Sequence, residues 1–273
     1  MKNCYESQYM KKKKVIFGAL AVLILLIAGF GIYKVMNTSP ETVEEAPTKK
    51  KTTVRNYNAI AVADRPYIKI VPIDARNISI VLEEVKKDAP VVDYELEYQT
   101  GTLVQGAFGQ IDSETTPVTE KILLGSCSAG GSCTYHEDIK GGELRMFFQG
   151  SENYDLKSDW KYFESSKTTS FTSKDAFFQL NSEDLTSNTL LVLYNSPGYP
   201  SALSGKLVSE IYTITSNRQL SGTAELSIRA KEEGALEIMG WDGEAWQSFE
   251  TTSDGKTATA TVDLLEAYVV INK

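Results

Sequence analysis

Residues 125–137, G-S-C-S-A-G-G-S-C-T-Y-H-E, hold two of the three cysteines and the only histidine of this 273-residue chain. The five residues between Cys127 and Cys133 exceed the spacers of redox C-x-x-C motifs and zinc knuckles. A small, flexible spacer of this kind does allow a disulfide at the tip of a hairpin. We therefore predict that Cys127 and Cys133 pair, with free thiols and a metal or redox centre as the alternatives.

Other residues that could take part in catalysis or metal binding are not part of a recognised sequence motif. His136 precedes Asp138 by two residues, but no G-x-S-x-G segment frames a serine for a catalytic triad. Asp93, Glu95 and Glu97 alternate along one predicted strand, so they share a face that either binds calcium or, as we expect, lies in solvent. Residues 153–160 are a second oxygen-rich candidate. We predict no metal, no cofactor and no enzyme activity.

Aromatic rings offer a different chemistry, because they stack on sugars. The candidates for ligand contact are Trp160, Trp241, Trp246 and Tyr199. Trp241 and Trp246 flank an Asp-Gly turn, which favours core packing for at least one of the two rings.

Residues 15–33 contain no charge and, as a helix, would span ~28 Å, close to the hydrocarbon thickness of a bilayer. We predict a transmembrane helix over residues 15–36. The alternative is a signal peptide with the lysines of residues 11–14 as its basic region. Bulky residues, instead of a small-residue cleavage site, follow the apolar run.

The charges on either side of this segment predict its orientation. Lysines precede it and acidic residues follow it, so the positive-inside rule keeps residues 1–14 in the cytoplasm and exports the remainder. Beyond residue 36 the chain has 22 basic and 35 acidic residues, a formal charge of −13. This acidity argues against a nucleic-acid partner, because phosphate binding needs the opposite sign. Cys4 would be an idle cytoplasmic thiol or a lipidation site.

The exported part has the pattern of an all-β protein. Residues 37–60 are polar and proline-containing, as in a stalk. Beyond them, apolar residues recur with period two between turn residues such as Gly141 and Gly142, with no long helical pattern. We expect two antiparallel β-sandwich domains, residues 61–165 and 166–273, divided near residues 165–174 and exported on a single N-terminal transmembrane helix. The predicted strands cover residues 67–71, 78–82, 92–98, 102–108, 121–124, 144–148, 190–194, 207–214, 224–230, 236–240, 258–262 and 268–271.

The C-terminal strands also resemble a known group. Segments at 178–181, 190–193, 207–214 and 224–228 precede L-E-I-M-G-W-D-G-E-A-W at 236–246, T-A-T-A-T-V at 257–262 and Y-V-V at 268–270. Together they resemble the ZU5/GAIN-like β-sandwich modules of cell-surface and adaptor proteins. Residues 65–164 resemble fibronectin-III- or immunoglobulin-type sandwiches, with Tyr94, Leu96 and Tyr98 inward.

Some ZU5/GAIN-like modules cleave themselves at an H-[FL]-[ST] tripeptide between the last two strands. The corresponding positions here are Leu264, Leu265 and Glu266, so base and nucleophile are both missing. The resemblance therefore implies no self-cleavage.

The expected function is non-catalytic adhesion, recognition or envelope structure by a membrane-anchored surface protein. Its partners would be the membrane and another surface or envelope protein or a glycan. One alternative is a carbohydrate-active or carbohydrate-binding module, which two or more carboxylates with an aromatic residue in one concave pocket would favour. Another is a tethered subunit of an envelope assembly, which an exposed apolar patch or an unpaired edge strand would favour.

Overall fold

The computed structural model describes residues 55–185 and 189–273, and Arg55–Lys273 form one compact unit. The predicted cytoplasmic tail, the predicted membrane segment and most of the predicted stalk lie outside the described residues. Within the described part, no helix has the length and apolar character needed to cross a membrane. Its one helical element is the 3-10 turn η1 (Val62–Asp64). The transmembrane helix over residues 15–36 thus stays a prediction.

The described chain is nearly all β and its strands pair antiparallel, as predicted. A ten-stranded sheet has the order β17-β16-β20-β14-β12-β9-β8-β3-β4, with β13 beside β20. A three-stranded sheet has the order β1-β2-β5, a five-stranded sheet β10-β11-β15-β19-β18, and β6 and β7 form a separate hairpin. The strands are β1 (Tyr67–Asp74), β2 (Asn77–Glu84), β3 (Val91–Thr100), β4 (Leu103–Asp112), β5 (Val118–Leu123), β6 (Gly125–Cys127), β7 (Cys133–Tyr135), β8 (Ile139–Gln149), β9 (Tyr154–Glu164), β10 (Ser170–Thr172), β11 (Phe178–Asn181), β12 (Leu190–Ser196), β13 (Lys206–Leu207), β14 (Ile211–Ser216), β15 (Thr223–Arg229), β16 (Leu236–Trp241), β17 (Trp246–Ser248), β18 (Thr252–Asp254), β19 (Thr257–Asp263) and β20 (Ala267–Asn272).

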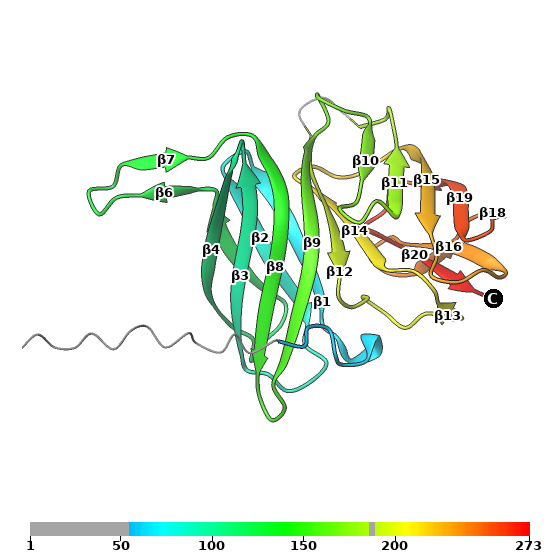
Figure 1. Cartoon of the computed structure of the whole chain (residues 1–273), viewed down its shortest axis with the longest axis horizontal. Helices are drawn as coiled ribbons and strands as arrows, with labels where there is room; N and C mark the ends of the chain where they lie inside the picture. Colours follow the sequence, from blue (N-terminus) through cyan, green and yellow to red (C-terminus); the bar gives the residue numbers. More distant parts are fainter. Residues whose placement is uncertain (1–54, 186–188) are drawn as a thin grey trace, which may run out of the picture. The chain divides into compact units, whose positions relative to one another are not determined.

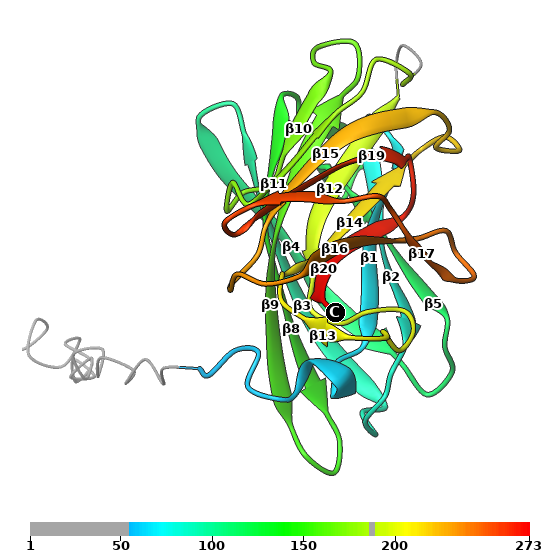
Figure 2. The ribbon, with the colours of Figure 1, turned by 90° about the vertical axis from the view of Figure 1, so that its right-hand side faces the viewer.

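The large sheet carries a smaller sheet on each of its two faces, as the alternation along β12 shows. Val192 and Tyr194 point into one hydrophobic cluster, whereas Leu191 and Leu193 point into another. Successive residues of a strand face opposite sides of its sheet, so the two clusters lie on opposite sides of β12. The first cluster lies between the large sheet and β1-β2-β5, and the second between the large sheet and the five-stranded sheet (Figures 1 and 2).

The predicted alternation of β3 is confirmed. Tyr94, Leu96 and Tyr98 are buried in the first cluster, and Glu95 and Glu97 are exposed on the opposite face. Leucine and tyrosine on the inner face and carboxylates on the outer one are the pattern of a strand with one solvated side.

The ten-stranded sheet draws strands from both predicted segments, because β3, β4, β8 and β9 continue without interruption into β12 and β14. Residues 165–169, at the expected boundary, connect β9 to β10. The division into domains over residues 61–165 and 166–273 stays a prediction.

Two local predictions were wrong. The predicted strand over residues 207–214 is interrupted, because Ser209 Oγ accepts the Val270 N–H at 2.8 Å in place of a main-chain acceptor. Gly141 and Gly142 form no turn but lie inside β8. A Cβ on Gly142 would stand 2.0 Å from the carbonyl oxygen of Glu97, so glycine allows the neighbouring strand to approach closely.

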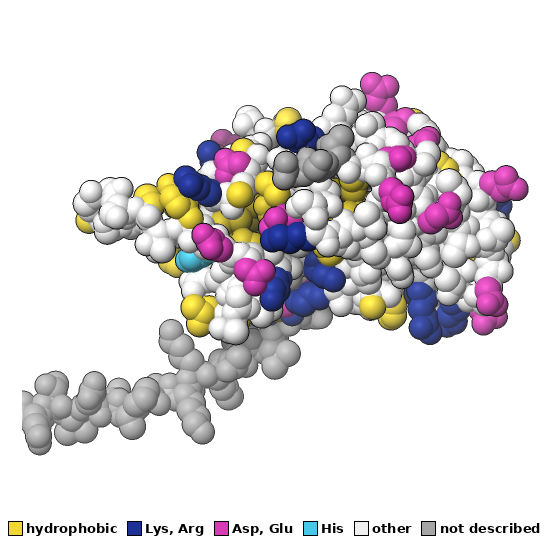
Figure 3. All heavy atoms as spheres, turned by 90° about the horizontal axis from the view of Figure 1, so that it is seen from above, with side chains coloured by type: hydrophobic (Ala, Val, Ile, Leu, Met, Phe, Trp, Pro, Cys, Tyr) yellow, Lys and Arg dark blue, Asp and Glu magenta, His cyan; other side chains and the backbone are white. Residues whose placement is uncertain are grey.

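The β6–β7 hairpin leaves the main body at the side where β4 is the outermost strand (Figure 1). Every residue of β7 is exposed. His136, the only histidine, directly follows β7, and its N–H donates to the carbonyl oxygen of Leu124 at 2.9 Å. Hydrophobic side chains gather where the hairpin joins the main body (Figure 3). The hairpin is thus an exposed arm with little support from either hydrophobic cluster.

Candidate binding groove

A groove of about 650 Å³ lies where the five-stranded sheet meets β9 of the large sheet. Five cationic and three acidic side chains line it, together with amides, hydroxyls and one exposed aromatic ring. The lining residues used below are Arg65, Lys157, Asp159, Asp175, Phe177, Asn195, Glu210, Arg229, Lys231 and Lys256. The local excess of positive charge contrasts with the −13 charge of the chain beyond residue 36.

Asp175 organises the centre of the groove through four hydrogen bonds. Its Oδ2 accepts from the Asn195 amide at 2.9 Å and from the Tyr212 hydroxyl at 3.0 Å. Its Oδ1 accepts from the Phe177 N–H at 3.0 Å and from the Ser173 hydroxyl. Burial, and then the charge of Asp175, raise the pKa of Tyr212 far above its usual value. Asp175 therefore ties a core tyrosine to the loop before β11.

This loop presents an aromatic ring to solvent. Ala176 adopts a left-handed conformation with φ +61°, and the next two residues point in opposite directions. Phe178 is fully buried, whereas Phe177 is 45% exposed. The guanidinium of Arg229 lies 5.6 Å from the centroid of the Phe177 ring. Phe177 and Arg229 thus form an exposed aromatic–cation pair at the rim of the groove.

The three carboxylates of the groove already have partners. Asp159 pairs with Lys174 at 2.6 Å, Glu210 pairs with Lys231 at 2.7 Å, and Asp175 accepts the four hydrogen bonds described above. Carboxylates held in place in this way can orient a ligand as hydrogen-bond acceptors.

The cations differ in how firmly they are held. Arg65 donates to the carbonyl oxygens of Asn58, Ile60 and Pro197, and burial lowers its pKa. The Arg65 side chain is therefore a fixed part of the groove wall. Among the described residues, the guanidinium of Arg229 has no ion-pair or hydrogen-bond partner, so it is the cation most available to a ligand.

The open face of β3, β8 and β9 continues this surface. Cross-strand neighbours place six carboxylates on it beside three cations. Arg145 is central, within 3.5 Å of Glu95 and 4.0 Å of Glu97 and in contact with Glu143. The carboxylates are Asp93, Glu95, Glu97, Glu143, Asp155 and Asp159, and the cations are Arg145, Lys157 and Lys161. This face is acidic, so the groove is the cationic part of the surface.

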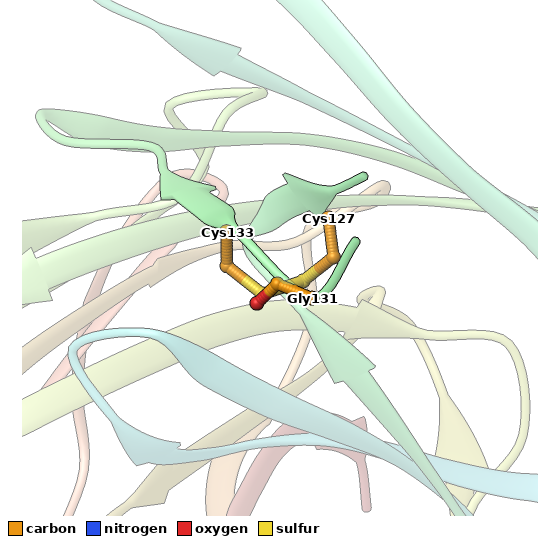
Figure 4. The surroundings of a disulfide bond; sticks show 3 residues. All are labelled: Cys127, Gly131 and Cys133. Atoms are coloured by element: carbon orange, nitrogen blue, oxygen red, sulfur yellow. A yellow bond between two sulfur atoms is a disulfide. The ribbon is translucent and has the colours of Figure 1, made fainter. Parts of the chain in front are cut away.

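The structure places the two hairpin cysteines at disulfide distance, as expected. Their sulfur atoms lie 2.04 Å apart at the end of the arm, opposite each other in the β6–β7 register (Figure 4). His136 Nδ1 lies 2.9 Å from the Tyr98 hydroxyl at the other end of the arm. The structure therefore separates the histidine from the cysteines.

The four aromatic candidates for ligand contact lie apart from the groove. Trp160 is fully buried and donates its indole N–H to the carbonyl oxygen of Glu97 at 3.2 Å, which gives it a core position. Trp241 is buried, Trp246 is half-buried, and their ring centroids are 5.5 Å apart across the β16–β17 pair. Tyr199 is half-buried with the Lys86 ammonium 4.6 Å from its ring centroid. A ligand role for these residues stays a prediction.

The oxygen-rich candidates take ordinary structural positions. Residues 153–160 lie mostly in β9. Within residues 55–185 and 189–273, no three histidine, cysteine or acidic side chains gather as a metal site would require. Leu264, Leu265 and Glu266 connect β19 to β20, between the last two strands.

Comparison with protein-family models, curated proteins and solved structures finds no match for this chain. The resemblance to ZU5/GAIN-like and fibronectin-III- or immunoglobulin-type modules accordingly stays a prediction.

Proposed function

We propose that this chain is a non-catalytic recognition protein of the cell surface, held by an N-terminal membrane anchor, which binds an anionic glycan in the groove. The observation that carries the proposal is the exposed Phe177–Arg229 pair beside Lys231 and Lys256 in an otherwise acidic molecule. An aromatic face suits a sugar ring, and a free guanidinium suits a carboxylate or another anionic substituent.

The other groups of the groove fit the same class of ligand. Asn195 and Asn58 offer amides, and Asp159 and Glu210 offer acceptors for sugar hydroxyls. Three carboxylates and an aromatic ring share one concave site, which is the arrangement expected of a carbohydrate-binding module. Because each carboxylate is held by a cation or by several donors, binding is the better explanation than hydrolysis, which needs a free acid and a free base.

Display outside the cell rests on the sequence alone. The uncharged residues 15–33, with lysines before them and acidic residues after them, support an uncleaved anchor and an exported C-terminal part. The stalk over residues 37–60 would hold the groove away from the membrane.

A glycan array tests the proposal, with the full-length chain in nanodiscs and paired acidic and neutral glycans. We expect binding to acidic glycans that weakens as salt rises, because exposed charges are screened. Phe177→Ala and Arg229→Ala should each lower affinity about 10-fold or more, which equals about 1.4 kcal/mol. Tyr135→Ala and Arg76→Ala are matched controls, because they remove an exposed aromatic ring and an exposed cation that pair outside the groove.

Equal binding of neutral and acidic glycans would contradict the anionic specificity. Capture of acidic peptides but no glycan would contradict the ligand class. Equal losses in the groove variants and in the two controls would contradict the site.

The alternative of a tethered assembly subunit is favoured by a different observation. The long strand β4 lies at the edge of the large sheet, and Phe108 on it is 86% exposed. An open edge of this kind recruits another strand.

A further inference from the structure

β4 (Leu103–Asp112) is an unusually open sheet edge. Among the described residues, its one strand partner is β3, so the backbone groups along its other side have no strand to pair with. Its sequence, L-V-Q-G-A-F-G-Q-I-D, carries no charge before its last residue. Exposed edges are normally protected by charged side chains, proline or short length, and β4 has none of these over nine residues.

The other sheet edges in the described part of the chain are protected. β10, β17 and β18 have three residues each. β1 (Tyr67–Asp74) and β5 (Val118–Leu123) are longer, but β1 carries Lys69 and Pro72, and β5 carries Glu120 and Lys121. β4 therefore differs from them both in length and in its lack of charge.

Two apolar side chains stand on the outer face of β4 with a glycine midway between them. Val104 is 65% exposed and Phe108 is 86% exposed. Gly106 lies on the same face, because residues two apart on a strand share a face. The outer face of β4 thus presents an apolar side chain, then a glycine without a side chain, and then a second apolar side chain.

This spacing is self-complementary, and we propose that β4 pairs antiparallel with β4 of a second copy of this chain about a two-fold axis at Gly106. In that register, Val104 of each copy lies opposite Phe108 of the other, so both apolar side chains gain a cross-strand partner. A shift by one residue would place outer-face residues opposite inner-face ones. A shift by two would break both Val–Phe pairs.

Charge does not oppose this pairing. The nearest carboxylates on the same face, Glu95 and Glu97 of β3, lie beside Arg145, which offsets their charge. Two uncharged edges can therefore approach, although the molecule as a whole is acidic.

A cysteine at the axis tests the register. In a Cys4→Ser background of the full-length chain in nanodiscs, Gly106→Cys would place two cysteines directly opposite each other. Opposite residues of antiparallel strands lie roughly 4.5–5.5 Å apart at Cα, within disulfide reach. We expect mild oxidation to link most of the protein as a species of twice the chain mass. The matched control, Gln110→Cys, lies on the same face four residues from the axis and should stay mostly unlinked.

A second variant tests the apolar pairs. Phe108→Glu in the wild-type chain should lower the dimer fraction at least about 10-fold in a concentration series measured by mass photometry, because it places an acid opposite Val104. Phe177→Glu, on the exposed aromatic of the groove, should leave dimerisation unchanged. A monomer at all concentrations, equal cross-linking at positions 106 and 110, or a cross-linked product with another protein would each overturn the proposal.

Discussion

The Tyr212 hydroxyl donates a hydrogen bond to Oδ2 of Asp175 over 3.0 Å. Tyr212 is a fully buried residue of β14, and Asp175 belongs to the loop before β11 that presents Phe177. This single contact joins the second hydrophobic cluster to the candidate groove. Changes to it should therefore alter both stability and binding.

Asp175→Ala is the direct test of that coupling. It removes the acceptor of four donors, among them the buried Tyr212 hydroxyl, so we expect the free energy of unfolding to fall by about 1–3 kcal/mol. Urea denaturation of the full-length chain measures this change. Asp159→Ala is the control, because it removes a half-exposed ion pair with a cost of about 0–1 kcal/mol. Equal effects of the two variants would contradict an organising role for Asp175.

Tyr154 and Tyr212 should respond in opposite directions to loss of their hydroxyl groups. Among the described residues, the buried Tyr154 hydroxyl has no hydrogen-bond partner, so Tyr154→Phe removes an unsatisfied polar group. We expect Tyr154→Phe to stabilise the protein by about 1 kcal/mol, because leaving such a group buried costs about that much. Tyr212→Phe should destabilise it, since Asp175 loses a donor. Thermal and urea unfolding of the pair provide the measurement, and destabilisation by Tyr154→Phe would contradict the expectation.

Buried tyrosines should make the fold sensitive to alkaline pH. Burial raises the pKa of Tyr162 to about 12 and the pKa values of Tyr154, Tyr194 and Tyr268 further still. In the unfolded chain, tyrosine releases its proton near pH 10. Between about pH 10 and the folded-state values, the folded state therefore binds more protons than the unfolded state, and stability falls as pH rises.

Tyrosinate absorbance and urea unfolding between pH 8 and 12 test this expectation. The free energy of unfolding should be nearly constant up to about pH 9.5 and then fall. The buried tyrosines should ionise together with unfolding. Stability that does not fall between pH 10 and 12 would contradict the assignment, as would full tyrosine ionisation of the folded protein near pH 10.

The alternation of apolar and polar residues made the fold class predictable from the sequence. Some strands were missed because charged residues on their outer faces obscured this alternation. In β3, the apolar Tyr94, Leu96 and Tyr98 stand out from the residues between them. In β9, Leu156 and Trp160 alternate in the same way, but lysine and aspartate between them gave the segment the appearance of an oxygen-rich cation site. The inward periodicity of β9 was the signal that could have identified it.

The groove could not be predicted in the same way, because its residues meet through strand pairing. Asp175 and Tyr212 are 37 residues apart in the sequence. They meet because β11 and β14 belong to two sheets that pack on one hydrophobic cluster. Phe177 and Arg229 come together because the Arg229 N–H donates to the carbonyl oxygen of Phe177 at 2.7 Å, next to the β11–β15 pairing. No local sequence motif indicates such contacts between segments that are distant in the sequence.

The arm that carries Cys127 and Cys133 should unfold separately from the main body. β6 and β7 pair with each other and not with a strand of the other three sheets. A two-stranded hairpin alone is marginally stable in water. The disulfide closes a short loop, for which chain entropy gives ~2 kcal/mol of stabilisation. That stabilisation acts on the arm, because few contacts transmit it to the two hydrophobic clusters.

Cys127→Ser/Cys133→Ser should therefore change local protection more than global stability. We expect faster proteolytic cleavage and faster hydrogen exchange within residues 125–135, with the free energy of unfolding of the main body changed by less than about 0.5 kcal/mol. Gly142→Ala is the contrasting variant, because a Cβ there would collide with the backbone of β3 in the centre of the large sheet. It should lower global stability by about 3 kcal/mol or more and leave cleavage of the arm in the folded state unchanged. A double cysteine variant with a comparable global loss would show that the arm is part of the cooperative fold and not a separate unit.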